Sequence, residues 1–382
     1  MKVAVPAETE PGERRVALVP ETAGKLVEAG LEVWLQAGAG AKATFSDKAY
    51  EDAGARIEPD VAKLLKGAEV VLEVQPPTET EVKLLPEGTV LISFLQPAVQ
   101  AKIVQTLARQ KVTSFGLEML PRISRAQSMD ALSSQASLAG YKAVLIAASR
   151  LGKFFPMLMT AAGTIAPARV LVLGAGVAGL QAIATGRRLG AVVEAYDVRP
   201  AVKEEVQSLG ARFIELELEA QEGAGGYARE QSEEFLRKQR ELIGEHVAAA
   251  DVVITTAAVP GRRAPLLVTA DMVKRMRPGS VIVDLAAETG GNVELTEPGK
   301  DVDVDGVAIV GTTNVPSTVA VHASQLYSRN VVNLLMHLLK DGKVVLDFED
   351  EITRETCVTH DGKVVNERAQ KMMEPATKEK VS

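Results

Sequence analysis

The sequence predicts an α/β protein with two open parallel-sheet domains. The chain has 382 residues, more than one hydrophobic core usually organises, which favours roughly two domains. Two separate series of short β-branched or apolar runs alternate with helical stretches, as they do in parallel α/β units. With 46% hydrophobic, 24% charged and 4% aromatic residues, the composition is that of a globular protein and excludes a disordered, collagen-like or disulfide-based chain.

The first third of the chain carries the strands of the first domain. Amphipathic segments lie between them, such as residues 21–29, which Gly30 ends, and these segments predict helices that pack on the sheet. The expected strands are Lys2–Val5, Leu31–Leu35, Glu69–Val74, Thr89–Phe94 and Val112–Phe115.

The second domain follows a change of pattern. An Ala-rich run, residues 133–151, predicts a connecting helix, and the Pro- and Gly-containing segment 155–167 predicts a hinge. Residues 318–339 predict a helix that returns to the first domain, and we expect residues 375–382 to be loose. The strands expected between hinge and return helix are Arg169–Leu173, Val192–Tyr196, Arg212–Ile214, Asp251–Thr255, Ser280–Asp284 and Val307–Val310.

This pattern predicts two Rossmann-like open parallel-sheet domains with a cleft between them, joined by long helices. We expect the first domain to be discontinuous, comprising residues 1–132 and 325–382. Residues 133–324 form the second domain, which includes the connecting helices.

Charge and composition exclude several classes of function. The 43 Lys and Arg and 50 Asp and Glu residues leave a net charge of -7, a poor match to nucleic acid. Cys357 is the single cysteine and only four His are present, which predicts no metal site and suits a reducing cytosol. We see no signal peptide, and the longest uncharged stretch, residues 306–328, is too polar to span a bilayer. If the protein works at a membrane, we expect another chain to supply the membrane-spanning part.

A glycine-rich turn predicts a dinucleotide site. Gly174, Gly176 and Gly179 follow a strand and open a helix, where they allow a tight turn, close approach of a pyrophosphate and close helix–strand packing. Asp197 ends the next strand and can accept hydrogen bonds from both adenosine-ribose hydroxyls. Its charge favours NAD(H) over NADP(H), although Arg199 lies two residues later.

Beyond this turn, several segments resemble those of alanine dehydrogenases and of the NAD(H)-binding component of proton-translocating transhydrogenase. The resemblance covers nearly the whole chain. It includes the segments Val5-Pro6-Ala7-Glu8, Arg15-Val16-Ala17-Leu18, Leu35-Gln36-Ala37-Gly38-Ala39-Gly40 and Val315-Pro316-Ser317.

The residues separate the two branches of this family. Alanine dehydrogenases use an Arg, a Lys and a His on the substrate, and an acidic residue near the nicotinamide. Arg15 and Glu288 are retained, but the Lys and His positions fall on Gln75 and Gln96. Because a glutamine amide has no useful pKa, the general acid–base group of amino-acid oxidation is lost. We therefore leave Arg15, which is as easily a structural remnant, out of the expected site.

The segment Pro121–Gln135 looks like the Arg-Gln-Asp loop of the transhydrogenase component. The resemblance implies that Arg122, Gln127, Asp130 and Ser133 surround the nicotinamide and face the domain that carries NADP(H). It also implies a mobile loop at residues 220–227 that folds Tyr227 over the nucleotide, and gives Tyr227 a catalytic role with the other four. The remaining implied cofactor contacts are Arg125, Ser128, Met129, Val177, Val198, Gly226, Gln239 and Ala258, besides the glycines, Asp197 and Arg199.

The resemblance implies a peripheral NAD(H)-binding subunit that passes hydride directly to NADP bound on a partner subunit. Since the sequence shows one dinucleotide-binding motif and no membrane-spanning segment, we expect a membrane-spanning proton-channel subunit and an NADP(H)-binding subunit as partners. The resemblance also implies attachment at the cytoplasmic face and a homodimer of this component. Two alternatives stay open: a free-standing alanine or related amino-acid dehydrogenase, and a nucleotide-binding protein without catalysis.

Overall fold

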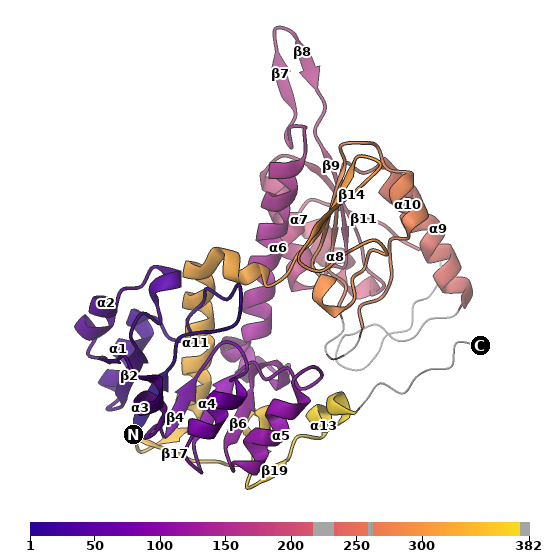
Figure 1. Cartoon of the computed structure of the whole chain (residues 1–382). Helices are drawn as coiled ribbons and strands as arrows, with labels where there is room; N and C mark the ends of the chain where they lie inside the picture. Colours follow the sequence, from indigo (N-terminus) through magenta and orange to yellow (C-terminus); the bar gives the residue numbers. More distant parts are fainter. Residues whose placement is uncertain (217–232, 259–260, 262, 375–382) are drawn as a thin grey trace. The chain divides into compact units, whose positions relative to one another are not determined.

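The computed structural model describes residues 1–216, 233–258, 261 and 263–374, and it confirms the predicted α/β fold (Figure 1). The chain divides into two compact units. Unit 1 comprises Met1–Gln135 and Ser317–Ser382, and unit 2 comprises Ala136–Pro316. The boundaries expected from sequence were 132/133 and 324/325. No helix in the described ranges is long and apolar enough to cross a membrane.

Unit 1 is built on a sheet with the order β19-β18-β6-β5-β4-β1-β2-β3. The six strands from β3 to β6 in this order are parallel, and β18 pairs antiparallel with both of its neighbours, β6 and β19. Relative to chain order, the parallel strands read 3-2-1-4-5-6, which is the doubly wound Rossmann order. The strands are β1 (Lys2–Val5), β2 (Glu32–Gln36), β3 (Arg56–Glu58), β4 (Val70–Leu72), β5 (Val90–Ser93), β6 (Thr113–Gly116), β18 (Cys357–His360) and β19 (Lys363–Val364).

Alternation along the strands builds a core on each face of this sheet. Val3 and Val5 of β1 point into one core, and Ala4 points into the other. Helices α1, α2 and α11 contribute to the first core, and α3, α4, α5 and α13 to the second. The helices are α1 (Pro20–Glu28), α2 (Asp47–Asp52), α3 (Val61–Leu65), α4 (Glu79–Leu84), α5 (Ala101–Arg109), α11 (Ala320–Leu338), α12 (Glu351–Thr356) and α13 (Glu367–Met373). A small hairpin pairs β16 (Leu339–Lys340) with β17 (Lys343–Val344).

Unit 2 repeats the same order of parallel strands in its own sheet, β11-β10-β9-β12-β13-β15-β14. All of its strands except the antiparallel β14 run parallel. The strands are β9 (Arg169–Leu173), β10 (Val192–Tyr196), β11 (Arg212–Phe213), β12 (Val252–Thr255), β13 (Val281–Asp284), β14 (Asp301–Val304) and β15 (Val307–Gly311). The reversal of strand order between β9 and β12 opens a crevice at their carboxyl ends, the usual place for a nucleotide in this fold.

Both faces of the second sheet are covered. Val170 and Val172 of β9 point into one core, with α6, α7 and α8, and Leu171 and Leu173 point into the other, with α9 and α10. This two-sided burial explains why residues 170–173 of β9 are all apolar. The helices are α6 (Ala131–Arg150), α7 (Val177–Arg188), α8 (Lys203–Ser208), α9 (Glu233–Ala249) and α10 (Ala270–Lys274).

The segment expected to be a hinge contains a hairpin. Strands β7 (Leu158–Thr160) and β8 (Gly163–Ile165) pair antiparallel and project from the sheet of unit 2 (Figure 1). Met159 is 71% exposed and Ile165 is 47% exposed. The hairpin therefore carries apolar side chains into solvent.

Helices α6 and α7 pack in unit 2 through a glycine. A Cβ at Gly140 would lie 2.0 Å from the carbonyl oxygen of Ala178. We predict that Gly140→Ala lowers the free energy of unfolding by about 1–3 kcal/mol, because the two helices must separate. Gly152→Ala is the matched control, since a Cβ there meets nothing within 4 Å. Urea unfolding followed by circular dichroism measures both, and equal stabilities of the two variants would contradict this packing.

Candidate dinucleotide-binding site

The glycine turn lies between β9 and α7, at the carboxyl end of the sheet of unit 2. Gly174 has a φ of 99°, which favours glycine. A Cβ at Gly179 would lie 1.8 Å from the carbonyl oxygen of Gly174, so α7 packs directly on the turn. A Cβ at Gly176 would meet nothing within 4 Å. The N-terminus of α7 therefore opens onto free space, with backbone N–H groups suited to bind a phosphate.

Asp197 lies beside this turn and is tied to it. Its Oδ2 accepts a hydrogen bond from the backbone N–H of Ala175 at 2.8 Å. Arg199 donates to Oδ1 from its backbone N–H and from Nε, both at 2.9 Å, and to Oδ2 from Nη2 at 2.8 Å. Burial by itself raises the pKa of Asp197, but the hydrogen bonds from Arg199 and Ala175 outweigh it, so the pKa is below its ordinary value. Asp197 is thus a carboxylate held at the crevice.

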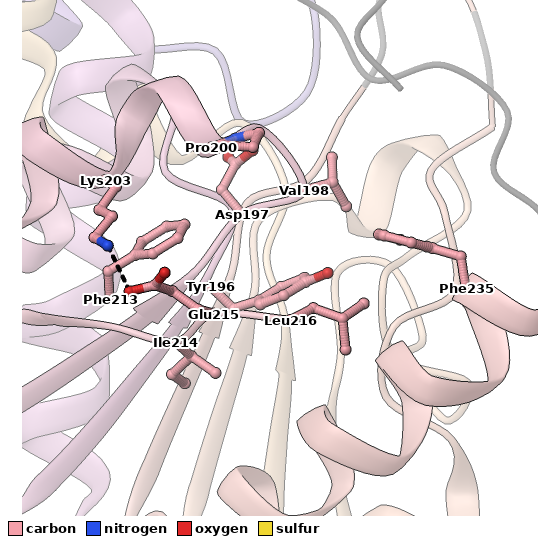
Figure 2. Close-up of a pocket in the computed structure, with 10 residues that line it drawn as sticks. All are labelled: Tyr196, Asp197, Val198, Pro200, Lys203, Phe213, Ile214, Glu215, Leu216 and Phe235. Atoms are coloured by element: carbon pink, nitrogen blue, oxygen red, sulfur yellow. Dashed lines mark ion pairs between the residues drawn. The ribbon is translucent and has the colours of Figure 1, made fainter. Parts of the chain in front are cut away.

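A pocket of about 80 Å³ adjoins Asp197 at the ends of β10 and β11. Figure 2 shows Tyr196 and Leu216 between Phe235 of α9 and the ion pair of Lys203 with Glu215, whose Nζ and Oε1 are 2.6 Å apart. The walls are mostly apolar, with a charged edge. They comprise Tyr196, Asp197, Val198, Pro200, Lys203, Phe213, Ile214, Glu215, Leu216 and Phe235.

Sequence reasoning did not single out most of this lining. Phe213 belongs to β11, which pairs with β10 and so ends beside Asp197. The apolar end of this neighbouring strand could have predicted the pocket from the sequence, because apolar residues at the ends of adjacent parallel strands line the same crevice. Phe235 comes from α9, and nothing in its local sequence marks it.

Three other predicted contacts, Gln239, Ala258 and Val177, belong to unit 2. Gln239 is 5% exposed, and its Nε2 donates to the hydroxyl of Tyr196 at 3.1 Å. Gln239 therefore holds a wall of the pocket. Ala258 follows β12 and is exposed, and Val177, 44% exposed, begins α7 beside the turn. The predicted contacts Gly226 and Tyr227 lie outside the described residues.

In unit 1, the segment expected to contact the nicotinamide is anchored in several ways. It forms a 3-10 helix, Ser124–Met129, and the side chain of Met129 is in the core. The carbonyl of Ser128 accepts hydrogen bonds from Nδ2 of Asn330 at 2.9 Å and of Asn333 at 3.0 Å. Both asparagines belong to α11, so this helix fixes the segment.

Asp130 caps the N-terminus of α6. Its Oδ1 accepts from the backbone N–H of Ser133 at 2.9 Å and its Oδ2 from the hydroxyl of Ser133 at 2.6 Å. Arg122 and Gln127 have exposed side chains. Arg125 pairs with Asp350, with Nη2 and Oδ1 3.1 Å apart. The structure thus presents polar side chains on a rigidly held segment.

Gln75 and Gln96 take part in a hydrogen-bonded chain in unit 1. Nε2 of Gln96 donates to Oε1 of Gln75 at 2.9 Å, and Nε2 of Gln75 donates to Oε2 of Glu13 at 2.7 Å. Glu13 also pairs with Arg15 through two hydrogen bonds of 2.8 Å and 2.6 Å. Nη1 of Arg15 donates to Gln135 at 3.0 Å. Arg15 and Glu13, 4% and 1% exposed, form a buried ion pair that the sequence analysis did not predict.

Two carboxyl groups of this hydrogen-bonded network, those of Glu13 and Glu8, have pKa values shifted in opposite directions. Burial tends to raise the pKa of Glu13, but the hydrogen bond and charge of Arg15 lower it to about 2. Burial raises the pKa of Glu8 to about 8, although the backbone N–H groups of Val74 and Gln75 donate to it. Glu13 is therefore ionised beside Arg15 at neutral pH, and the amides of Gln75 and Gln96 have no titratable proton.

Comparison with known proteins fits this architecture. The family model described as alanine dehydrogenase/PNT, N-terminal domain, matches residues 4–139, and the corresponding C-terminal domain model matches residues 143–367. The chain belongs to this family. The resemblance noted from the sequence is thereby confirmed.

The most similar relatives include members named as transhydrogenase subunits. The chain is 52% identical to a Rhodospirillum rubrum protein named as the first part of the NAD(P) transhydrogenase alpha subunit, over 96% of this chain and 98% of that one. It is 32% identical to an alanine dehydrogenase of Halomonas elongata, over 95% and 94% of the two chains. The solved transhydrogenase structure from Sinorhizobium meliloti superposes with a TM-score of 0.88 at 47% identity, covering 96% of this chain and all of that one.

The buried ion pair generates a prediction about pH. Because the pKa of Glu13 is lowered in the folded state, its stabilising effect is complete above the unfolded pKa of about 4.5 and is lost as the pH falls towards 2. Glu13→Gln leaves Arg15 buried without its counter-charge and should destabilise the protein by about 3–5 kcal/mol at pH 7.

The difference between the wild type and Glu13→Gln should shrink by about 1.4 kcal/mol between pH 7 and pH 3.5. Denaturant unfolding at both pH values measures it. The exposed pair Lys48–Asp52 supplies the control variant Asp52→Asn, which should change stability by less than about 1 kcal/mol. A difference for Glu13→Gln that is independent of pH would contradict the assignment.

Proposed function

We propose that this chain is the NAD(H)-binding peripheral subunit of a proton-translocating transhydrogenase. In it, hydride passes directly between NADH and NADP⁺ bound on a partner subunit. The observation that carries the proposal is the hydrogen-bonded pair Gln75–Gln96, which stands where alanine dehydrogenases are expected to carry a Lys and a His. An amide pair cannot move the proton that amino-acid oxidation releases. Hydride transfer between two nicotinamides needs no such group.

The nucleotide end of the proposal rests on unit 2. The turn at Gly176 leaves space for a pyrophosphate beside the N-terminus of α7. The apolar pocket beside Asp197 suits the adenine ring. The carboxylate of Asp197 accepts four hydrogen bonds in the structure, three of them from Arg199. Binding of the two ribose hydroxyls therefore requires Arg199 to give up some of its hydrogen bonds to this carboxylate. The carboxylate repels a 2'-phosphate, which favours NAD(H) as the cofactor.

The reacting end of the proposal rests on the anchored segment of unit 1. We assign contacts with the nicotinamide and its ribose to Arg122, Gln127, Asp130 and Ser133, and we keep for Tyr227 the catalytic role that the resemblance implies. Asp130 and Ser133 are oriented by the cap of α6, and Gln127 is exposed on the adjacent 3-10 helix. Their role is orientation and exclusion of water, which lowers the barrier of a transfer that needs no acid or base.

The partners follow from the same assignment. The relative from R. rubrum is named as one portion of a subunit, and it has nearly the length of this chain. We infer that separate chains supply the proton-conducting membrane part and the NADP(H)-binding domain, and that the subunit attaches at the cytoplasmic face. We also infer a homodimer, because the hairpin β7–β8 exposes Met159 and Ile165, whose burial against a second copy would be favourable.

An amino-acid dehydrogenase is the second candidate. A solved L-alanine dehydrogenase superposes with a TM-score of 0.83 at 28% identity, and Arg15 is present. However, Glu13 and Gln135 already bind the guanidinium of Arg15. A substrate carboxylate would have to displace them, and the amides of Gln75 and Gln96 cannot act as its general acid or base.

We predict that Gln127→Ala and Asp130→Asn slow hydride transfer at least tenfold and change the dissociation constant of NADH less than twofold, because positioning of the ring is lost. Asparagine also caps helices, so Asp130→Asn preserves α6. The measurement is single-turnover absorbance in the complex reconstituted with the NADP-binding partner, with an NADP⁺ analogue whose reduced form absorbs at a distinct wavelength.

The matched control is Asp60→Asn, which makes the same exchange at the cap of α3. It should leave transfer unchanged. Normal transfer rates in Gln127→Ala and Asp130→Asn would remove this segment from the reacting site.

A further inference from the structure

The amide of Asn292 clamps the chain just beyond β12. Its Oδ1 accepts from the backbone N–H of Ala257 at 3.0 Å, and its Nδ2 donates to the carbonyl of Ala257 at 2.8 Å. Nδ2 also donates to the carbonyl of Pro265 at 2.8 Å. Asn292 is fully buried. One side chain thus binds both backbone polar groups of a residue at the crevice.

Asn292 is itself held by a buried carboxylate. Oδ2 of Asp284 accepts from the backbone N–H of Asn292 at 2.9 Å and of Val293 at 3.2 Å, and from the hydroxyl of Thr296 at 2.8 Å. Oδ1 accepts from the hydroxyl of Thr255 at 2.8 Å and from the backbone N–H of Ala286 at 2.9 Å. These donors satisfy the carboxylate, which makes Asp284 a rigid support.

The clamp extends to the glycine turn. Thr256, next to Ala257, donates its hydroxyl to the carbonyl of Gly174 at 3.0 Å and its backbone N–H to the carbonyl of Leu173 at 2.8 Å. A Cβ at Gly174 would lie 2.6 Å from the hydroxyl oxygen of Thr256. The position of Ala257 therefore sets the position of the turn on this side.

We propose that Asn292 is a positioning residue for the nicotinamide half of the dinucleotide. The proposal rests on the function proposed above. Asp197 follows β10, on one side of β9, so the adenosine half lies there. Ala257 and Asn292 follow β12 and β13, on the other side, which the nicotinamide half must cross. Asn292 acts through the backbone of Ala257 and needs no contact with the nucleotide.

The test compares NADH with adenosine, which lacks the phosphates assigned to the glycine turn and so occupies only the side of Asp197. Asn292→Ala and Thr256→Val should each weaken NADH binding at least about fivefold, the scale of a lost hydrogen bond. Both should change adenosine binding less than twofold, because adenosine has no phosphate to bind the turn. Because a merely destabilised unit 2 would weaken the two ligands alike, the ratio of their dissociation constants is the readout, measured by calorimetric titration of the full chain.

The control is Asn366→Ala, which removes a buried asparagine that caps α13 and donates to the carbonyl of Glu355. It should lower stability without altering either dissociation constant. An unchanged NADH-to-adenosine ratio of dissociation constants in both Asn292→Ala and Thr256→Val would overturn the positioning role alone. Failure of the wild-type chain to bind NADH would overturn the proposed function as well.

Discussion

The structure of the nucleotide site depends on the contact between α7 and the turn that precedes it. Gly179 has no room for a side chain because the carbonyl of Gly174 occupies that space. This contact sets α7 against the end of β9 and directs its free N–H groups to the crevice. Asp197 then binds the turn through Ala175, and Thr256 binds it from the other side. The turn is thereby fixed from both neighbouring strands.

The second constraint is the chemistry of the side chains that form the hydrogen-bonded network of unit 1. Glu13 and Arg15 neutralise each other in a buried pair, and the amides of Gln75 and Gln96 continue the chain without a titratable group. Such a set can orient a polar molecule but cannot carry a proton at neutral pH. A relative with a different reaction can keep the same fold, because activity depends on a few side chains at the crevice.

Sequence reasoning was most successful where local pattern decides structure. β9 was predicted from its run of apolar residues, which the structure buries on both faces of the sheet, and the glycine turn was predicted from the spacing of its glycines. Strands β3 and β19 were not predicted because they are short, and β18 was not predicted because it pairs with β6 across a long sequence separation. The buried pair of Glu13 and the pocket wall at Phe235 depend on tertiary contacts, which no local pattern reveals.

The most direct test of the account compares the chain with the dehydrogenases of its family. The purified chain is titrated with NADH by fluorescence and assayed with NAD⁺ and L-alanine by the absorbance of NADH. We expect saturable NADH binding without alanine oxidation, because the amides of Gln75 and Gln96 cannot act as general acid or base. Robust alanine oxidation would contradict it, and would show that the amide pair leaves the dehydrogenase chemistry intact.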